Sequence, residues 1–388
     1  MDEAAFLRTR YLVSRRDKSA NVMILKKSHR LRQRSGIALI IVLLVITVLA
    51  ILAGGFAYSM KVETQLARNA SFDDDLFWVA WGGLEAAKYE LAADMQGPCA
   101  QFDSLKDQWA GGPGCDETGE AGPPAEHRLE FEPGKYATWK IVDAERKFNI
   151  NAAAQPILQQ AMTLIGLDPA SHSTVIDSIL DWTDGNQDPG PSGAENDFYQ
   201  SGQGPYGSPH NAKNAPIDDI SELLMINGIT RGIYEGSGGI DTTAPLATAR
   251  AARSRFDEPI YAVGLRDLFC AVSSRTLNIN TASETALQLL PPVDANVAAA
   301  IIQRRAGPDG IDGTIDDTPF RNPQELGSIP GLPQPVMQQI MAYVGVRSQV
   351  FEVTVEAHIG GQHRTYTGLI YRLSQRDLTV LAFAPKWE

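Results

Sequence analysis

Histidine is scarce in this chain of 388 residues, and the short motifs that place catalytic groups are missing. The six histidines form no H-E-x-x-H pair, and the chain contains neither G-x-S-x-G nor G-x-x-x-x-G-K-[ST]. Those patterns hold a zinc ion, expose a nucleophilic serine and cradle phosphates, respectively. Their absence leaves no positive signal for catalysis, and we expect a protein that is not an enzyme.

Basic residues are also in short supply once the N-terminal end is set apart. Residues 1–36 hold 10 basic and 3 acidic residues out of 34 and 46 in the whole chain. The remainder therefore has 24 basic and 43 acidic residues, a balance of −19. Such a surface repels nucleic acid and anionic lipid and favours metal cations or basic protein surfaces. We expect no nucleic-acid partner.

Only three cysteines are present. Cys99 and Cys115 lie at the two ends of a loop rich in glycine and proline, and in an oxidising compartment they would form a disulfide, with free thiols as the alternative. Cys270 lies in an apolar run at 268–272, where we expect it to be a small buried apolar residue. The cysteines therefore predict one structural disulfide and no reactive thiol.

Charge is absent from residues 37–58, a run of 22 residues made mostly of Ile, Leu, Val and Ala. A helix of this length is about 33 Å long, enough to cross a hydrocarbon core of about 30 Å. The run is preceded by Lys26, Lys27, Arg30, Arg32 and Arg34. Because basic flanks stay in the cytoplasm, we expect a single-pass inner-membrane protein with a cytoplasmic N-terminus and the large C-terminal part across the membrane.

The junction at 35–40 (Ser-Gly-Ile-Ala-Leu-Ile) resembles the processing site of a type IV prepilin. There, a membrane peptidase cuts after a glycine, so we expect cleavage between Gly36 and Ile37 and N-methylation of Ile37. A secretory signal peptide would be cut beyond the apolar run instead, and an ordinary signal anchor is the alternative. The leader has 36 residues if it begins at Met1 and 14 if it begins at Met23, which we favour.

Ile41 marks a departure from most pilins and pseudopilins, which have a glutamate at the fifth mature position. That glutamate is thought to pair with the terminal amine of a neighbouring subunit. A carboxylate in hydrocarbon is costly unless it is paired, by at least about 2.5–3.5 kcal/mol. A subunit without it fits a single place at a filament tip better than a repeated place in the shaft.

Strand patterns occur in two separate parts of the chain. Residues 127–131 and 136–142 flank a Pro-Gly turn, and residues 350–358, 365–373 and 378–383 form a second set. Both sets have the alternation or β-branched composition of strands. The N-terminal helix is expected to continue to about residue 95, and residues 148–346 have helical and polar-loop patterns. We therefore expect one small antiparallel sheet whose strands are separated in sequence by a helical insert.

The insert contains an internal repeat. Residues 148–153 (Phe-Asn-Ile-Asn-Ala-Ala) match 277–282 (Leu-Asn-Ile-Asn-Thr-Ala), and 221–229 match 324–332. Measured between these matches, the first copy is 26 residues longer, with most of the excess in the Gly/Pro/Asp-rich stretch at 181–216. Asn side chains accept hydrogen bonds from exposed helix N–H groups. We expect the Asn-x-Asn pairs to form caps and turns, with no catalytic role.

Two acidic loops in the insert are candidate calcium sites. The first concentrates oxygen donors: Asp181, Asp184, Asp188, Glu195, Asn196 and Asp197. The second and weaker set is Asp309, Asp312, Asp316 and Asp317. Ca²⁺ takes six to eight oxygen ligands and tolerates irregular loops, although neither spacing is that of an EF-hand. A solvated acidic loop is the alternative for the first set, and an acidic turn relieved by glycines is the alternative for the second.

Together these features resemble the K-type minor pseudopilins of bacterial type II secretion systems (the general secretion pathway protein K family). The resemblance rests on the 35–40 junction, the absent glutamate at position 41, the split sheet and the doubled insert. It rests also on the stretches 181–184 (Asp-Trp-Thr-Asp), 193–199 and 277–282, and it covers roughly residues 30–384. The family is also associated with Ca²⁺ bound in the inserted domain.

The resemblance implies an α+β protein with a type IV pilin-like fold, in which a long N-terminal transmembrane helix packs on a small antiparallel sheet. A large all-α domain of two SAM-like repeats is inserted between the strands. The expected segments are a removed leader (1–36), the helix (37–95), a loop with the first strands (96–147), the first repeat (148–235), a connecting segment (236–276), the second repeat (277–346) and the last strands (347–388).

The resemblance also implies partners and a place in the cell. The I- and J-type minor pseudopilins, the major pseudopilin, the prepilin peptidase and the inner-membrane secretion platform are the expected partners. The tip complex would cap a periplasmic pseudopilus that helps to export folded proteins. Two alternatives stay open: a minor pilin of a type IV pilus, and a membrane-anchored helix-hairpin-helix DNA-binding protein. Against the latter, Pro333 replaces a glycine whose N–H would reach phosphate.

Overall fold

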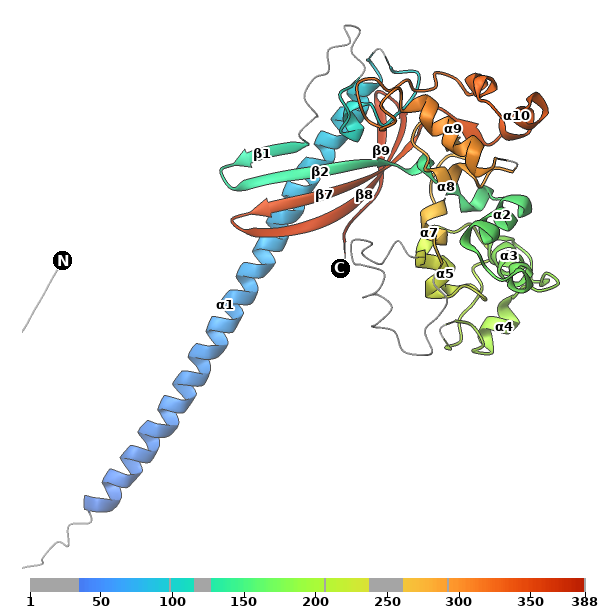
Figure 1. The fold of residues 1–388 in the computed structure, drawn as a ribbon. Helices are drawn as coiled ribbons and strands as arrows, with labels where there is room; N and C mark the ends of the chain where they lie inside the picture. Colours follow the sequence, from blue (N-terminus) through green and yellow to red (C-terminus); the bar gives the residue numbers. More distant parts are fainter. Residues whose placement is uncertain are drawn as a thin grey trace, which may run out of the picture. The chain divides into compact units, whose positions relative to one another are not determined.

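The computed structural model describes residues 35–97, 99–114, 127–205, 207–236, 261–291 and 293–386 (Figure 1). It divides into two compact units, residues 1–68 and 69–388, which are treated separately below. The basic leader at 1–34 and Cys115 lie outside the described residues. Cys99 is disulfide-bonded and Cys270 is a free cysteine. The pairing of Cys99 with Cys115 stays a prediction.

The helix α1 (Ser35–Asp94) is 60 residues long and extends through both units. In the first unit its apolar side chains are exposed, Ile41 to 57%. Among the described helices it is the one long and apolar enough to cross a membrane. In the second unit one face of α1 is buried, through Leu76, Val79, Ala80, Leu84, Ala87 and Leu91. The same helix therefore supplies a lipid-compatible segment and a packing face.

Five antiparallel strands form the sheet against which this face packs. Their order is β1 (Arg128–Glu132), β2 (Lys135–Asp143), β7 (Val350–Ile359), β8 (Gln362–Ser374) and β9 (Asp377–Pro385). The two sets of strands meet where β2 pairs with β7. The split antiparallel sheet predicted from the sequence is confirmed, with strand ends that differ by at most three residues.

Gly83 sets how closely α1 approaches the sheet. A Cβ atom added at this position would lie 2.8 Å from Val355 Cγ1 and 2.9 Å from Ala137 Cβ. These two side chains are fully buried and come from the paired strands β7 and β2. Since protein interiors are close-packed, any side chain at position 83 would push the helix away from the sheet.

The insert between β2 and β7 consists of short helical elements in two copies. The first contains η2 (Ala144–Arg146), β3 (Phe148–Asn149), η3 (Ile150–Ala152), α2 (Gln155–Ile165), α3 (Pro169–Thr183), α4 (Asn196–Gln200), η4 (Ile220–Met225), α5 (Arg231–Glu235), α7 (Leu265–Leu268) and β4 (Phe269–Cys270). The second contains β5 (Leu277–Asn278), α8 (Glu284–Leu287), α9 (Ala295–Arg305), η6 (Pro323–Ser328), α10 (Gln334–Ile340) and β6 (Val344–Gly345). We call residues 144–346 the helical module.

Each copy is closed by a two-residue parallel strand pair. β3 pairs with β4 through Phe148 and Phe269, and β5 pairs with β6 through Leu277 and Val344. The first and last segments of a copy therefore lie side by side, which is what makes each copy a unit. One continuous apolar core runs through both copies.

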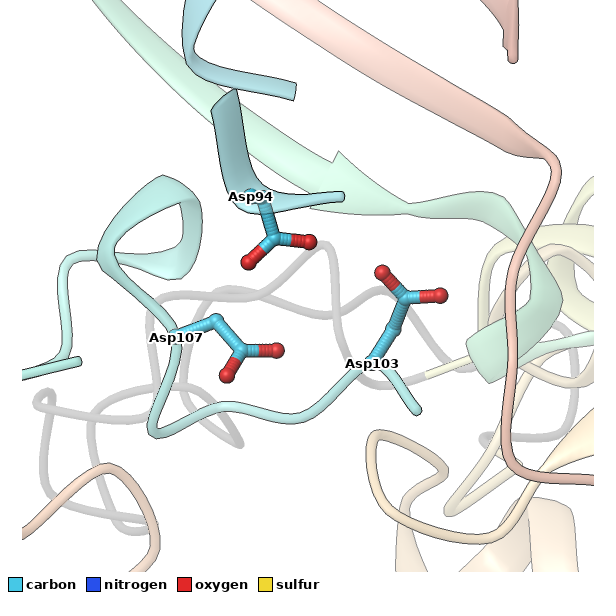
Figure 2. A group of neighbouring side chains, drawn as sticks. All are labelled: Asp94, Asp103 and Asp107. Atoms are coloured by element: carbon cyan, nitrogen blue, oxygen red, sulfur yellow. The ribbon is translucent and has the colours of Figure 1, made fainter. Parts of the chain in front are cut away.

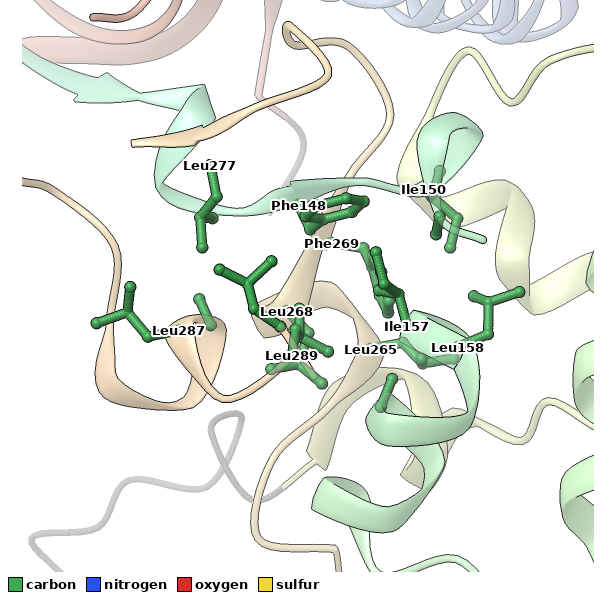
Figure 3. Close-up of a cluster of buried hydrophobic side chains, with 14 of the residues drawn as sticks. Phe148, Ile150, Ile157, Leu158, Leu265, Leu268, Phe269, Leu277, Leu287 and Leu289 are labelled. Atoms are coloured by element: carbon green, nitrogen blue, oxygen red, sulfur yellow. The ribbon is translucent and has the colours of Figure 1, made fainter. Parts of the chain in front are cut away.

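One part of the expected connecting segment (236–276) packs with the first copy. Residues 265–270, assigned from the sequence to a connecting segment, belong to the core of the helical module. Leu265, Leu268 and Phe269 are fully buried beside Phe148 and Ile157 (Figure 3). The segment is too short to show helical or strand periodicity. Its partner strand lies more than a hundred residues earlier in the chain, so its place in the core could not be predicted from the local sequence.

Candidate functional site

The first acidic loop is folded around the carboxylate of Asp181, near the end of α3. Asp181 is 3% exposed, and its two carboxylate oxygens accept hydrogen bonds from the Gly190 N–H at 3.0 and 3.1 Å. A Cβ atom at position 193 would overlap Asp181 Oδ2, so that position requires glycine. Burial raises the pKa of Asp181, and the nearby Asp184 carboxylate raises it further. The loop thus holds a buried carboxylate in an acidic environment.

Glu195 and Asn214 add buried oxygens that have no hydrogen-bond partner. Glu195 is 4% exposed, and its Oε1 accepts no hydrogen bond, nor does the buried Oδ1 of Asn214. The two side chains meet, because Asn214 Nδ2 donates to Glu195 Oε2 at 3.3 Å. Asn214 is the one non-glycine residue with positive φ (47°) among the described residues. Unpaired buried acceptors are costly, and a hard cation is the ligand that would satisfy them.

The structure brings together only part of the predicted first set. The charges of Asp181 and Asp184 both raise the pKa of Glu195, after burial as the main cause, so these three carboxylates lie near one another. Asp188 and Asp197 are exposed. Asn196 uses both ends of its amide, accepting from the Ala212 N–H and donating to Gln187. Asn214 was missed because it lies 17 residues beyond the acidic stretch and carries no charge.

In the second acidic loop, one carboxylate forms an ion pair and the other three accept hydrogen bonds from neutral groups of the loop. Arg305, 4% exposed, donates to both carboxylate oxygens of Asp312 at 2.9 and 2.7 Å. Asp316 and Asp317 each accept from the Thr314 hydroxyl and from a backbone N–H. Asp309 accepts from the Ile311 N–H at 2.8 Å. The geometry favours the acidic turn relieved by glycines over a calcium site.

The first Asn of each Asn-x-Asn pair accepts a hydrogen bond from the backbone N–H two residues on, as predicted for caps and turns, and the second Asn also acts as a clamp to a distant segment. Asn151 exchanges two hydrogen bonds with the backbone of Ile217, and Asn280 does the same with Phe320. The clamps join residues 66 and 40 positions apart, and this difference of 26 equals the extra length of the first copy. The repeat read from the sequence is therefore a repeat of the same hydrogen-bonded turn.

A group of buried carboxylates, which the sequence analysis did not single out, joins the helical module to the sheet. Asp143 ends β2 and accepts from Asn278 Nδ2 at 3.1 Å, from Ser348 Oγ at 2.7 Å and from the Thr281 hydroxyl. Glu145 accepts from the N–H groups of Ser274 and Val350. A typical hydrogen bond contributes about 0.5–1.5 kcal/mol to stability, and one to an ionised group about 1.5–3 kcal/mol.

Burial makes these carboxyl groups unusually weak acids. It raises the pKa of Asp143, and together with the Asp143 charge it raises the pKa of Glu145 to about 8. Close by, burial raises the pKa of Asp94 to about 7, although Arg372 opposes the shift. In the sequence, Asp143 and Glu145 look like any polar residues at the end of a strand, because burial by segments distant in the chain gives no local signal.

These raised values predict an inverted pH dependence of stability. The unfolded chain releases these protons near pH 4, while the folded chain keeps them to about pH 7–8. Between these limits the folded state binds more protons than the unfolded state. The free energy of unfolding therefore falls as pH rises, by up to about 1.4 kcal/mol per pH unit for each such group. Thermal unfolding of the full chain in detergent with chelator, from pH 5 to 8, measures this.

The matched control is Glu145→Gln, which keeps a hydrogen-bond acceptor but cannot ionise. We expect its melting temperature to vary less with pH than that of the wild type. A wild-type melting temperature that rises between pH 5 and 8 would contradict the assignment.

Comparison with known proteins shows what this chain is similar to. Residues 140–236 match the family model for protein K of the type II secretion system. Type II secretion system protein K of Escherichia coli K12 is 26% identical over 216 residues, and that of Klebsiella pneumoniae is 29% identical over 220 residues. These alignments cover 52% and 53% of this chain but only 60% of each relative.

Two further matches extend over more of the chain. Protein K of Pectobacterium carotovorum subsp. carotovorum is 24% identical over 376 residues, covering 89% of this chain and 95% of that one. The crystal structure of the GspK-GspI-GspJ complex from enterotoxigenic Escherichia coli contains a chain of the same fold, with a TM-score of 0.59 and 18% identity over 83% of this chain and 99% of that one. The chain described here is thus similar to protein K of the type II secretion system, by a family model over residues 140–236 and by fold over most of its length.

Proposed function

We propose that this protein is the minor pseudopilin at the tip of a periplasmic pseudopilus and assists the export of folded proteins across the outer membrane. The observation that carries the proposal is the architecture: α1 packs on a five-stranded sheet that is interrupted, between β2 and β7, by the two-copy helical module. A solved chain of the same fold is part of a GspK-GspI-GspJ complex, which suggests I- and J-type pseudopilins as partners.

Two features support a place at the tip. Ile41 lacks the carboxylate that positions repeated shaft subunits, so nothing at this point of α1 can pair with a neighbour's terminal amine. The helical module is also a large addition to a pilin-like subunit. A terminal subunit has no successor in the filament, so its bulk is tolerated there without steric conflict.

A partner surface is available on the second unit. The face of α1 opposite the sheet leaves Trp78 66% exposed and Tyr89 76% exposed, three helical turns apart. Large aromatic side chains are enriched among residues that dominate binding energy at protein interfaces. We assign this face to contact with the helices of the I- and J-type partners.

Co-purification tests the tip assignment. The full chain, in detergent, is expected to form a 1:1:1 complex with the I- and J-type pseudopilins from the same secretion system. Trp78→Glu should weaken the complex at least tenfold, because it places a charge in the interface. Leu381→Glu, a change of the same kind at a 48% exposed residue of β9, should not. A folded wild-type chain that binds neither partner would move the assignment to a type IV pilus pilin.

Processing at the membrane is part of the proposal. We infer that a prepilin peptidase cuts between Gly36 and Ile37 and that Ile37 is then N-methylated, which leaves α1 as a single membrane anchor with the rest of the chain in the periplasm. In cells with the peptidase, the intact mass of the purified protein should correspond to methylated 37–388. Gly36→Val should retain the leader and Ser35→Ala should not. A wild-type mass that includes residues 1–36 would contradict this.

Calcium binding at the first acidic loop is the last part of the proposal. Asp181, Asp184, Glu195 and Asn214 would supply carboxylate and amide oxygens, and the unpartnered Glu195 Oε1 and Asn214 Oδ1 support this assignment. The ion would order the loop between α3 and η4 and so shape one side of the helical module.

Calcium titration of the full chain in detergent tests this site. Calcium should raise the melting temperature of the wild type, and Glu195→Gln should remove at least part of that rise by removing one ligand charge. Glu284→Gln, at an exposed residue of α8, is the control and should behave as the wild type. The same calcium response in Glu195→Gln as in the wild type would exclude the site.

A further inference from the structure

Two histidines face each other across the hairpin of β7 and β8. His358 and His363 are direct partners in the register of these strands, and their rings lie 5.7 Å apart between centroids, with an interplanar angle of 24°. Side chains directly opposite each other in an antiparallel pair lie on the same face of the sheet, with Cβ atoms about 4.5–5.5 Å apart. The two imidazoles are therefore close enough to bind a common ligand.

The pair lies on the face of the sheet opposite α1, which we call the outer face. Successive side chains of a strand point to opposite faces, and on β7 the side chains of Val355 and Ala357 are fully buried in the core shared with α1. The His358 side chain is 26% exposed, and His363 is exposed. Solvent and dissolved ions therefore reach both imidazole rings.

Glu356 adds a carboxylate beside the two imidazoles. It lies two residues before His358 on β7, and its Oε2 is 3.6 Å from His358 Nε2. This separation is too long for a hydrogen bond, for which N···O distances are about 2.7–3.2 Å. It is close to the roughly 3.3 Å between two ligand atoms that each lie about 2.0–2.1 Å from one tetrahedral zinc ion. The carboxylate and the imidazole are thus spaced as two ligands of one ion.

Contacts with the neighbouring strands hold the His358 ring in place. Tyr136 of β2 stacks on this ring with centroids 4.5 Å apart and 12° between the planes, and Arg128 of β1 lies 3.9 Å from the centre of the Tyr136 ring. The hairpin turn is fixed as well, because the Gly360 N–H donates to the Gly134 carbonyl of the neighbouring turn at 3.1 Å. A site that is ordered before its ligand arrives loses less conformational entropy on binding.

We propose that His358, His363 and Glu356 bind one divalent metal ion of the zinc class on the outer face of the sheet. Imidazole ligands suit Zn²⁺, Cu²⁺ and Ni²⁺, whereas sites made only of carboxylates, carbonyls and water suit Ca²⁺ and Mg²⁺. The exposed His363 ring reaches the ion by rotation about its side-chain bonds. Three protein ligands leave one tetrahedral position for water or for a group of another protein. The proposal does not depend on the function proposed above.

Other acidic groups of the chain differ from this site in their ligand chemistry. Asp94, Asp103 and Asp107 lie together where α1 ends and offer only carboxylate oxygens (Figure 2). The first acidic loop likewise offers carboxylate and amide oxygens. Since calcium prefers oxygen ligands, an excess of calcium competes with zinc at such groups but not at a pair of imidazoles. Zinc binding measured in excess calcium therefore reports on the histidines.

Zinc binding to the full chain in detergent tests the proposal. Equilibrium dialysis with radioactive zinc, in excess calcium and without an affinity tag, gives the number of ions and their affinity. Loss of an outer-shell partner already costs about 10–100-fold in metal affinity, so we expect His358→Gln and His363→Gln each to weaken binding at least tenfold. Glu356→Gln should weaken it as well. Zinc binding in either histidine variant equal to that of the wild type would overturn the proposal.

His172→Gln is the matched control. His172 lies in the helical module, where its Nε2 is 2.9 Å from the Leu167 carbonyl oxygen, far along the chain from the hairpin. This variant should bind zinc as the wild type does. A loss in His172→Gln as large as in His358→Gln would show that zinc binds histidines without regard to their place, and would overturn the proposal.

A double variant distinguishes one shared ion from two separate ions. If both imidazoles hold the same ion, the variant with both His358→Gln and His363→Gln loses the same number of ions as either single variant. Losses that add in the double variant would mean that each histidine binds an ion of its own, and the proposal would be wrong.

Thermal unfolding separates the loss of a ligand from damage to the fold. Both histidines lie on the solvent-facing side of the sheet, so in chelator each variant should melt as the wild type does. With zinc, the melting temperature of the wild type should rise, because the ion joins β7 to β8 and binds only the folded state. A rise of the same size in His363→Gln would contradict the proposed site.

Discussion

The structure depends on a few buried carboxylates that hold two differently built modules together. Asp143 and Glu145 stand where the sheet gives way to the helical module, and between them they accept hydrogen bonds from residues of the helical module and from the first residues that return to the sheet. A purely apolar contact at this junction would allow the helical module to shift relative to the sheet, because apolar contacts have no preferred direction. Hydrogen bonds to a buried carboxyl group are directional, and breaking one leaves a desolvated polar group without a partner. The junction is therefore specified in geometry as well as stabilised.

Arg372 extends this network to the end of the long helix. Its guanidinium contacts Asp94 and Asp103, donates to the Ser348 carbonyl at 3.0 Å and lies 4.5 Å from the centre of the Phe351 ring. Its side chain is 1% exposed. One residue of β8 thus contacts α1, the following loop and β7. Arginine suits this position because its planar guanidinium spreads five N–H donors over three nitrogen atoms, whereas the three donors of lysine share one atom.

Much of the fold could be predicted from the sequence, and the reasons are local. The uncharged run at 37–58, the alternation in the strands and the two Asn-x-Asn pairs each carry their signal within a few residues. The junction was not predictable, since Asp143 and Asn278 lie 135 residues apart and neither is unusual in its own segment. The same holds for Asn214, which completes the first acidic loop from outside it. In the second acidic loop nothing in the sequence indicated the buried ion pair between Arg305 and Asp312, and calcium binding there stays a prediction. The likeness of each repeat to a SAM domain stays a prediction.

The register between β2 and β7 has a consequence for how such a chain can change over evolutionary time. Asp143, where the chain leaves the sheet, is paired directly with Phe351, just after the chain returns. To the sheet, the entire helical module is equivalent to the short connection of a β-hairpin. Segments within the helical module can therefore change in length without shifting the pairing of β2 with β7. Exposed loop tips are the places where such insertions are tolerated. The two copies differ by 26 residues in length inside the module, yet their clamps have the same form.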